Sequence, residues 1–228
     1  EQWGVECVHH FRGMFAFALW DRRQQVFFMA RDRLGVKPLH YAITDEGFLV
    51  FGSELKTLTA WPGFRRDIDD EAVEDYFGYG YVPEPRTIYK SALKMPPGCR
   101  ILIKRGQPVP QPEQYWDVPF QPQSTLSIED AQTEFIERLR EAVNIRMVAE
   151  VPLGAFLSGG VDSSAVVAMM AGLADQPVKT CAIAFSDPKY NEAEYAQAVA
   201  ERYHTDHHVH TVESDDISLV DELARLYD

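Results

Sequence analysis

The chain has 228 residues, 46% of them hydrophobic, and 35 acidic residues against 22 basic ones give it a formal net charge of −13. An anionic surface repels the phosphates of nucleic acids, and no apolar run approaches the ~20 residues that cross a bilayer, so we expect a soluble globular protein without nucleic-acid or membrane partners. The cysteines Cys7, Cys99 and Cys181 are far apart and odd in number, which argues against a secreted disulfide framework and favours a cytoplasmic location.

The first half of the chain has the pattern of an antiparallel sheet. Short apolar runs alternate with polar turns, which is typical of a β-meander. The predicted strands are Met14–Trp20, Val26–Ala30, Leu39–Ile43 and Phe48–Phe51. Both odd and even positions of Met14–Trp20 are apolar, so we expect this strand to be covered on both faces.

A helix and a further strand follow these runs. The Asp69 carboxylate can accept hydrogen bonds from the free N–H groups of a first helical turn, and we expect this helix to end at Gly78. The helix is predicted to direct three side chains inward, those of Val73, Tyr76 and Phe77. Cys99–Lys104 is predicted to be one more strand.

A proline-rich segment separates the two halves. Five prolines lie from Pro108 to Pro122, a composition that keeps the backbone extended and unpaired. We therefore expect one domain with its linker over residues 1–122 and a second domain over residues 123–228.

Beyond the linker, predicted helices and strands alternate. Ser127 and Asp130 are spaced as in a capping box at the start of a helix. The predicted strands are Val151–Leu157, Val178–Phe185 and His207–Val212, and the helices between them are Ser163–Leu173 and Asn191–Tyr203. This alternation predicts a parallel sheet, which binds ligands where its strands end. The last residues, Tyr227-Asp228, are also predicted to be helical.

The stretch after the first of these strands has the composition of an anion site. Its residues are Leu157, Ser158, Gly159, Gly160, Val161, Asp162, Ser163 and Ser164. Glycines let backbone N–H groups approach an oxyanion, serines add hydroxyl donors, and the helix start adds about half a positive charge. Asp162 by itself would repel a phosphate, so we expect it to hold Mg²⁺ against phosphates. The structural alternative is a Gly-Ser turn that only caps a helix.

Three other motifs do not fit this stretch. A Walker loop needs a Lys, and none lies between Glu150 and Gln176. The dinucleotide fingerprint needs three spaced glycines, and a hydrolase elbow needs a Gly where Phe156 stands. The string Ser158–Ser164 instead resembles the signature of the ATP pyrophosphatase ligases, which use ATP as an AMP donor and bind the departing pyrophosphate in this loop.

Segments of both halves make the resemblance narrower. They are Phe11–Asp21, Ala30–Leu39, Gly52–Lys56, Met95–Gly98, Tyr115-Trp116 and Val151–Gly154. Together they are similar to the glutamine-hydrolysing asparagine synthetase family over nearly the whole chain. The resemblance implies the C-terminal half of an Ntn-type antiparallel β-sandwich, which is a glutamine amidotransferase domain, followed by the start of a doubly wound parallel α/β ATP pyrophosphatase domain.

The same resemblance implies a reaction and its site. ATP adenylates the side-chain carboxylate of aspartate, pyrophosphate leaves, and ammonia from glutamine displaces AMP to give asparagine. Leu157, Ser158–Ser164 and Ile183 correspond to ATP-contacting positions, with Asp162 as the Mg²⁺ ligand. The full-length form is expected to be a homodimer.

The glutaminase nucleophile of this family is an N-terminal cysteine whose free α-amine is the base. Cys7 is internal, so its nitrogen is an amide and cannot be that base. We expect the nucleophile to precede this chain and the family's second ATP loop to follow it, which leaves no complete catalytic set here. The chain alone is expected to hydrolyse no glutamine.

Several alternatives stay open. The acceptor is either aspartate or another carboxylate, on a cell-surface precursor or a peptide, and a non-catalytic nucleotide-binding relative is the third option. Arg31-Asp32-Arg33 is either an acid–base group or an ion pair that fixes a turn. Four histidines fit either a zinc site or, as we favour, a surface strand: His204, His207, His208 and His210. Four aromatic residues either stack on a base or, as we favour, pack at a helix end: Tyr76, Phe77, Tyr79 and Tyr81.

Overall fold

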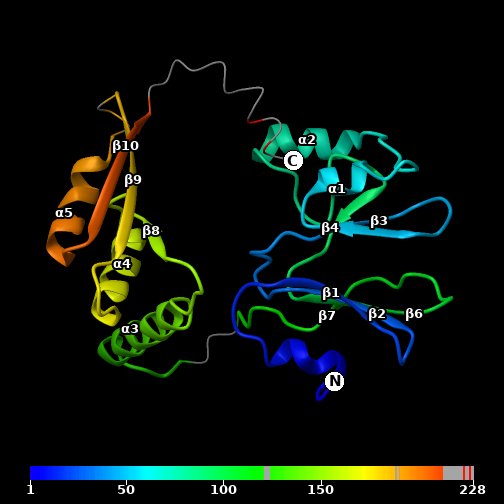
Figure 1. Cartoon of the computed structure of the whole chain (residues 1–228), viewed down its shortest axis with the longest axis horizontal. Helices are drawn as coiled ribbons and strands as arrows, with labels where there is room; N and C mark the ends of the chain where they lie inside the picture. The colour runs from blue at the N-terminus through cyan, green and yellow to red at the C-terminus, as the bar shows by residue number, and fades with distance from the viewer. Residues whose placement is uncertain (121–123, 188, 190, 213–222, 224–225, 227–228) are drawn as a thin grey trace. The chain divides into compact units, whose positions relative to one another are not determined.

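The structure is a computed structural model, and it describes residues 1–120, 124–187, 189, 191–212, 223 and 226. Contacts divide the chain into two compact units, one built mainly on Glu1–Gln121 and the other on Pro122–Leu223 (Figure 1). No helix in the described ranges is long and apolar enough to cross a membrane. The helix predicted at Tyr227-Asp228 lies outside the described residues.

The first unit holds two antiparallel sheets. One sheet has the order β1-β2-β6-β7, with strands β1 (Ala16–Asp21), β2 (Val26–Arg31), β6 (Cys99–Lys104) and β7 (Glu113–Gln114). The other has the order β4-β3-β5, with strands β3 (His40–Ile43), β4 (Leu49–Gly52) and β5 (Ala92–Lys94). Met29 and Ile101 of the first sheet and Tyr41 of the second lie in one buried cluster, so the two sheets share a hydrophobic core.

The predicted strands are confirmed, but they do not form one continuous meander. The hairpins β1–β2 and β3–β4 are antiparallel as expected. However, β2 pairs with β6, with Met29 opposite Ile101, and not with β3. The turn after Arg31 carries the chain out of the first sheet and into the second.

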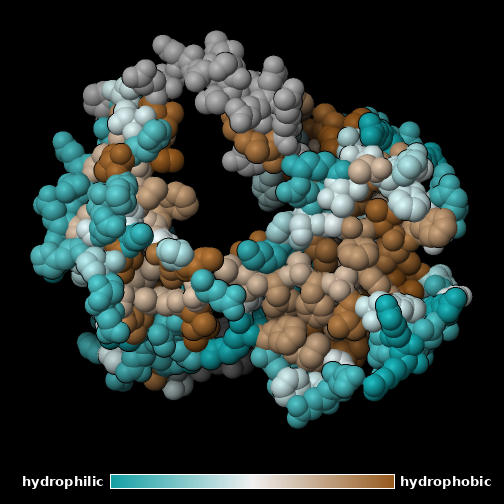
Figure 2. Space-filling view, in the orientation of Figure 1, coloured by the Kyte–Doolittle hydropathy of each residue, from teal (hydrophilic) through white to brown (hydrophobic). Residues whose placement is uncertain are grey.

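The expectation that the first strand is covered on both faces holds only for its first residues, because Ala16 and Phe17 point to opposite faces and pack against two different buried clusters. Leu19 is 53% exposed and Trp20 is 43% exposed. These two side chains point to opposite faces of the sheet, so neither face is fully covered at this end of β1. Figure 2 shows hydrophobic surface on this unit, coloured brown.

Three short helices accompany the sheets: the 3-10 helix η1 (Gly4–His9), α1 (Leu55–Thr59) and α2 (Asp70–Tyr79). The predicted cap of α2 is confirmed, because the Asp69 side chain accepts a hydrogen bond from the backbone N–H of Glu71 at 3.2 Å. The helix ends at Gly80 in the left-handed conformation, two residues later than expected.

The predicted inward face of α2 is wrong for its two aromatic residues, whereas Val73 is half-buried. Phe77 is 83% exposed and Tyr76 is 54% exposed, whereas the buried residue of the helix is Ala72. Phe77 lies five residues beyond Ala72, which is about 140° around a helix with 3.6 residues per turn. The two aromatic rings contact each other edge to face at 5.8 Å, and those of Tyr79 and Tyr81 lie 6.3 Å apart, so the expected packing at the helix end is limited to these two exposed pairs.

The proline-rich segment is extended, but its described part is not unpaired. Within it, β7 pairs with β6 in the register Cys99 to Gln114. The N–H groups of Tyr115 and Trp116 both donate to the carbonyl of Gly98, at 2.8 and 3.2 Å. These hydrogen bonds tie the segment to the first unit as far as Trp116.

The second unit contains the predicted parallel sheet. Its elements are α3 (Ile128–Asn144), β8 (Gly154–Phe156), α4 (Val161–Leu173), β9 (Lys179–Phe185), α5 (Ala193–Tyr203) and β10 (Asp206–Val212). The strand order is β10-β9-β8, and both pairings are parallel. The capping interaction of α3 is confirmed, because Ser127 Oγ accepts from the N–H of Asp130 at 3.1 Å.

The described helices cover one face of this sheet. Val167 of α4, Ala182 of β9 and Ala196 of α5 lie in one buried cluster, and α3 packs on α4. On the other face, Ile183 is 50% exposed and Phe156 is 78% exposed. A doubly wound sheet carries helices on both faces, so the described part shows only one of the two expected helical layers.

Candidate functional site

The predicted anion loop is the connection from β8 to α4 (Figure 1). Leu157 is 1% exposed, and its N–H donates to the carbonyl of Cys181 at 2.8 Å, which continues the pairing with β9 beyond the end of β8. The chain then turns at Gly159 and Gly160 and enters α4 at Val161. The loop therefore lies at the carboxyl end of a parallel strand, where such sheets bind ligands.

Gly159 is required at its position for two physical reasons. Its φ of +81° lies in the left-handed region, which residues with a Cβ rarely adopt. A Cβ there would also lie 2.3 Å from Cβ of Tyr195 and 2.6 Å from the backbone nitrogen of Ala196. The first turn of α5 therefore rests directly on the loop.

The serine hydroxyls hold the loop in shape. Ser158 Oγ lies 3.0 Å from Ser163 Oγ and accepts from the N–H of Gly160 at 3.3 Å. Ser163 Oγ accepts from the N–H of Ser158 and lies within donating distance of the Gly160 carbonyl, at 3.3 and 3.2 Å. The hydroxyls expected to face an anion are thus partly engaged within the loop itself.

Backbone N–H groups are the donors that remain available. The first intrahelical hydrogen bond of α4 runs from the N–H of Ser164 to the Gly160 carbonyl at 3.0 Å. The amides of Val161, Asp162 and Ser163 precede it and have no partner within the helix. Val161 is 86% exposed, so this positive helix end is open to an anion.

Two further groups of the loop have unmet hydrogen-bonding capacity. The Asp162 carboxylate is exposed in the first turn of α4. Mg²⁺ bound to phosphates commonly takes only one or two protein carboxylates, so a single Asp fits this donor set. Ser164 Oγ is buried without a hydrogen-bond partner in the described part of the chain.

A cavity of about 270 Å³ adjoins the loop. Three of the predicted residues line it, Leu157, Ser158 and Ile183. Sequence reasoning missed other lining residues, which come from β8, β9 and the start of α5: Phe156, Phe185 and Glu192. Phe185 could have been predicted, because residues two positions apart on a strand share a face and Ile183 was already assigned to the site. Glu192 could not, because it reaches the cavity only through the packing of α5.

The Arg31-Asp32 turn of the first unit is structural. Arg31 is 6% exposed, and its guanidinium donates to Glu84 Oε1 and to the Met95 carbonyl, both at 2.6 Å. Asp32 is 2% exposed and accepts from the backbone N–H groups of Val36 at 3.0 Å and Lys37 at 2.9 Å. The turn is thus fixed as expected, but by an Arg31–Glu84 ion pair and by backbone hydrogen bonds to Asp32 and not by an ion pair within Arg31-Asp32-Arg33.

The histidines of the second unit do not share a helix face. The helix α5 ends at Tyr203, as predicted. His207 Nδ1 lies 2.8 Å from Thr180 Oγ1, whereas the neighbouring His208 is exposed. Among the described residues no group of three or more His, Cys, Asp and Glu side chains could hold a metal ion.

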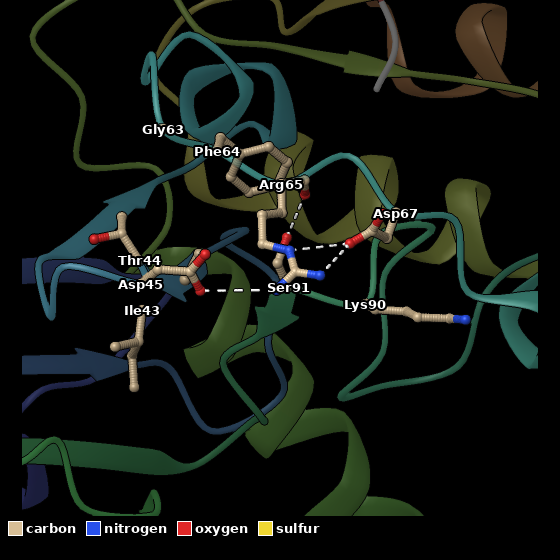
Figure 3. Close-up of a pocket in the computed structure, with 10 residues that line it drawn as sticks. Ile43, Thr44, Asp45, Gly63, Phe64, Arg65, Asp67, Lys90 and Ser91 are labelled. Atoms are coloured by element: carbon tan, nitrogen blue, oxygen red, sulfur yellow. Dashed lines mark hydrogen bonds and ion pairs between the residues drawn. The ribbon is translucent and has the colours of Figure 1, made fainter.

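A second cavity, of about 310 Å³, lies in the first unit near β3 and α1. Figure 3 shows that three of its charged side chains, those of Arg65, Asp67 and Asp45, interact with one another, whereas Lys90 extends away from them. Arg65 contacts Asp67 at 2.9 Å and Asp45 at 3.8 Å, and Ser91 Oγ donates to the Arg65 carbonyl at 2.6 Å. This cavity contains none of the predicted site residues.

Comparison with known proteins places both units in one family. Residues 1–116 match the model of the glutamine amidotransferase domain, and residues 134–228 match that of asparagine synthase. A protein of Methanocaldococcus jannaschii, provisionally named glutamine-hydrolysing asparagine synthetase 2, is 36% identical over 99% of this chain and 44% of its own length.

Two more relatives have different names. The glutamine-hydrolysing asparagine synthetase 3 of Bacillus subtilis is 34% identical over 97% of this chain and 38% of its own length. The amidase chyE of Penicillium rubens is 34% identical over 78% of this chain and 26% of its own length. The chain thus spans less than half the length of these relatives. It belongs to the glutamine-hydrolysing asparagine synthetase family.

Proposed function

We propose that the protein containing this chain is an ATP-dependent carbon–nitrogen ligase that makes asparagine from aspartate with ammonia taken from glutamine. The observation that carries the proposal is the β8–α4 loop, which presents the open amides of Val161, Asp162 and Ser163 beside an apolar cavity. The same chain also contains a glutamine amidotransferase domain. Its presence supports glutamine as the source of the ammonia.

In this proposal the loop binds the two terminal phosphates of ATP. The amides at the start of α4 stabilise the negative charge that develops on pyrophosphate as it leaves, and preorganised dipoles of this kind contribute strongly to rate. Asp162 would hold Mg²⁺, which neutralises charge between phosphate oxygens. The aspartate carboxylate attacks the α-phosphorus, and ammonia then displaces AMP.

The finer assignments are part of the same proposal. The nucleoside of ATP occupies the cavity lined by Leu157 and Ile183. The parallel sheet that borders this cavity is of the ATP pyrophosphatase type. The two antiparallel sheets of the first unit, with their shared core, support an Ntn-type sandwich. The whole protein acts in the cytoplasm as a homodimer, with glutamine, aspartate and ATP as substrates.

The decisive assay identifies the nucleotide product. The whole protein is incubated with ATP, Mg²⁺, an ammonia source and candidate carboxylates, aspartate first. We expect AMP and pyrophosphate in amounts equal to the asparagine formed. ADP as the stoichiometric product would contradict the mechanism, whereas AMP with another acceptor would retain the mechanism and change the substrate.

The role of Asp162 is tested by Asp162→Ala. Because the backbone donors remain and one charge-assisted contact is lost, we expect the Mg²⁺-dependent affinity for ATP to fall about 10-fold or more, as measured by calorimetry. The control is Asp175→Ala, which removes an exposed carboxylate just beyond the other end of α4. Equal Mg²⁺-dependent affinity in both variants would remove Asp162 from its assigned role.

A further inference from the structure

The cavity beside the loop contains one charged side chain. Glu192 lines it together with apolar residues that include Phe156 and Ile183. The Glu192 carboxylate is exposed and makes no hydrogen bond or ion pair with any described residue. A charged acceptor without a partner at the rim of an apolar cavity is available to hydrogen-bond donors of a ligand.

The backbone of Glu192 is held in place relative to the loop. Its carbonyl accepts from the N–H groups of Tyr195 at 3.1 Å and Ala196 at 3.2 Å, which starts α5. The same two residues lie against Gly159, where the space for a Cβ is filled. The first turn of α5 therefore sets the position of this carboxylate with respect to the loop.

The strand order brings Glu192 and the loop to the same edge of the sheet. The loop follows β8, Glu192 follows β9, and these strands are parallel neighbours. Adjacent strands lie about 4.8 Å apart, so groups that follow their ends reach the same ligand. In dinucleotide-binding sheets the glycine-rich turn after one strand binds phosphates and an acidic residue farther along the chain binds the ribose 2′-hydroxyl, which is the same division of roles.

The chemistry of the carboxylate distinguishes between the parts of ATP. A carboxylate repels phosphate, and the 6-amino group of adenine lies between two ring nitrogens that are themselves acceptors. Ribose instead offers two adjacent hydroxyl donors, which match the two oxygens of one carboxylate. We propose that Glu192 binds the ribose hydroxyls of ATP and selects ribonucleotides over deoxyribonucleotides. This inference rests on the proposed function.

The test compares the dissociation constants of Mg-ATP and Mg-2′,3′-dideoxy-ATP by calorimetry with the whole protein. We expect the wild type to prefer ATP about 10- to 100-fold, because hydrogen bonds to a charged group are lost with the dideoxy nucleotide. Glu192→Ala should bind both nucleotides equally, with its affinity for the dideoxy nucleotide unchanged. Glu192→Gln keeps one acceptor oxygen and should show an intermediate preference.

The matched control is Glu194→Ala, an exposed glutamate of α5 that does not line the cavity and should keep the wild-type preference. An undiminished preference for ATP in Glu192→Ala would overturn the inference and leave the proposed function intact. A changed discrimination between ATP and ITP with an unchanged ribose preference would also overturn it, because the carboxylate would then face the base. If the wild type binds no ATP, the proposed function fails, and this inference fails with it.

Discussion

The Arg31-Asp32 turn of the first unit and the β8–α4 loop of the second are both rich in polar groups, but they use these groups in opposite ways. The Arg31 guanidinium is buried and donates to Glu84 and to the carbonyls of Met95, Gly35 and Lys37. In the loop, the first amides of α4 and the Asp162 carboxylate are exposed.

The two segments differ in how far their polar groups are paired within the chain. Burying a charge is costly unless its donors and acceptors are paired, and the buried Arg31 guanidinium makes four hydrogen bonds, one of them to the Glu84 carboxylate. The loop leaves donors open at a helix end, and in the proposed function the phosphates of ATP supply the missing acceptors. Substitution of the first cluster should therefore affect stability, and substitution of the second should affect nucleotide binding.

The largest expected effect is that of Arg31→Ala. It leaves Glu84 without its partner and three carbonyls without their donor, so we expect the free energy of unfolding of the first unit to fall by about 3–5 kcal/mol. All four tryptophans lie in residues 1–121, so denaturant unfolding followed by tryptophan fluorescence reports on this unit.

Two variants accompany this measurement. Arg31→Lys keeps the charge but loses most of the guanidinium contacts, and it should fall between the wild type and Arg31→Ala. Arg22→Ala removes an exposed arginine in the β1–β2 turn and should change stability by less than about 0.5 kcal/mol. A loss below about 1 kcal/mol in Arg31→Ala would mean that the cluster is not structural.

Gly159→Ala tests the other side of the comparison. The positive φ and the 2.3 Å approach of Tyr195 should together cost about 2–4 kcal/mol within the second unit, and displacement of the loop should lower ATP affinity at least about 10-fold. Calorimetry with Mg-ATP measures the affinity. The tryptophan-detected unfolding of the first unit should not change.

The control for this variant lies in the same unit. Gly172 is in α4, and a Cβ there meets no atom within 4 Å. Gly172→Ala should stabilise the helix by about 0.5–1 kcal/mol and leave ATP affinity unchanged. If both variants bind ATP like the wild type, the contact between the loop and α5 has no role in binding.

Tyr115→Phe is expected to have the smallest effect, and it tests the hydrogen bond to the backbone carbonyl of Arg31. The Tyr115 hydroxyl donates to the Arg31 carbonyl at 2.7 Å, and burial raises the pKa of this phenol to about 12. The neutral phenol is therefore favoured in the folded state, and its contribution is full below pH ~10, the unfolded value, and is lost as the pH rises towards 12. Removal of the hydroxyl should cost about 1 kcal/mol at pH 8.

The measurement is unfolding of the first unit between pH 8 and pH ~12. The difference between the wild type and Tyr115→Phe should shrink as the pH rises. Tyr79→Phe, at a tyrosine that is 67% exposed, is the control and should match the wild type throughout. A difference that grows with pH would contradict the assigned direction.

The sequence by itself determined the features that depend on near neighbours along the chain. The caps at Asp69 and Ser127 form as predicted, because each involves residues only two or three positions apart. The alternation of strands and helices after residue 127 predicts the parallel sheet for the same reason. The residues of the anion loop lie between β8 and the first turns of α4, where the local pattern placed them.

Only the tertiary structure decided which distant segments meet. Met29 of β2 lies opposite Ile101 of β6. The sequence of β2 does not specify this partner, because any strand with a matching pattern of apolar residues could pair with it. Gly159 is needed partly because Tyr195 approaches it, and Glu192 lines the cavity because α5 packs on the loop. Local propensity extends over a few residues, whereas burial depends on contacts between residues far apart in the chain.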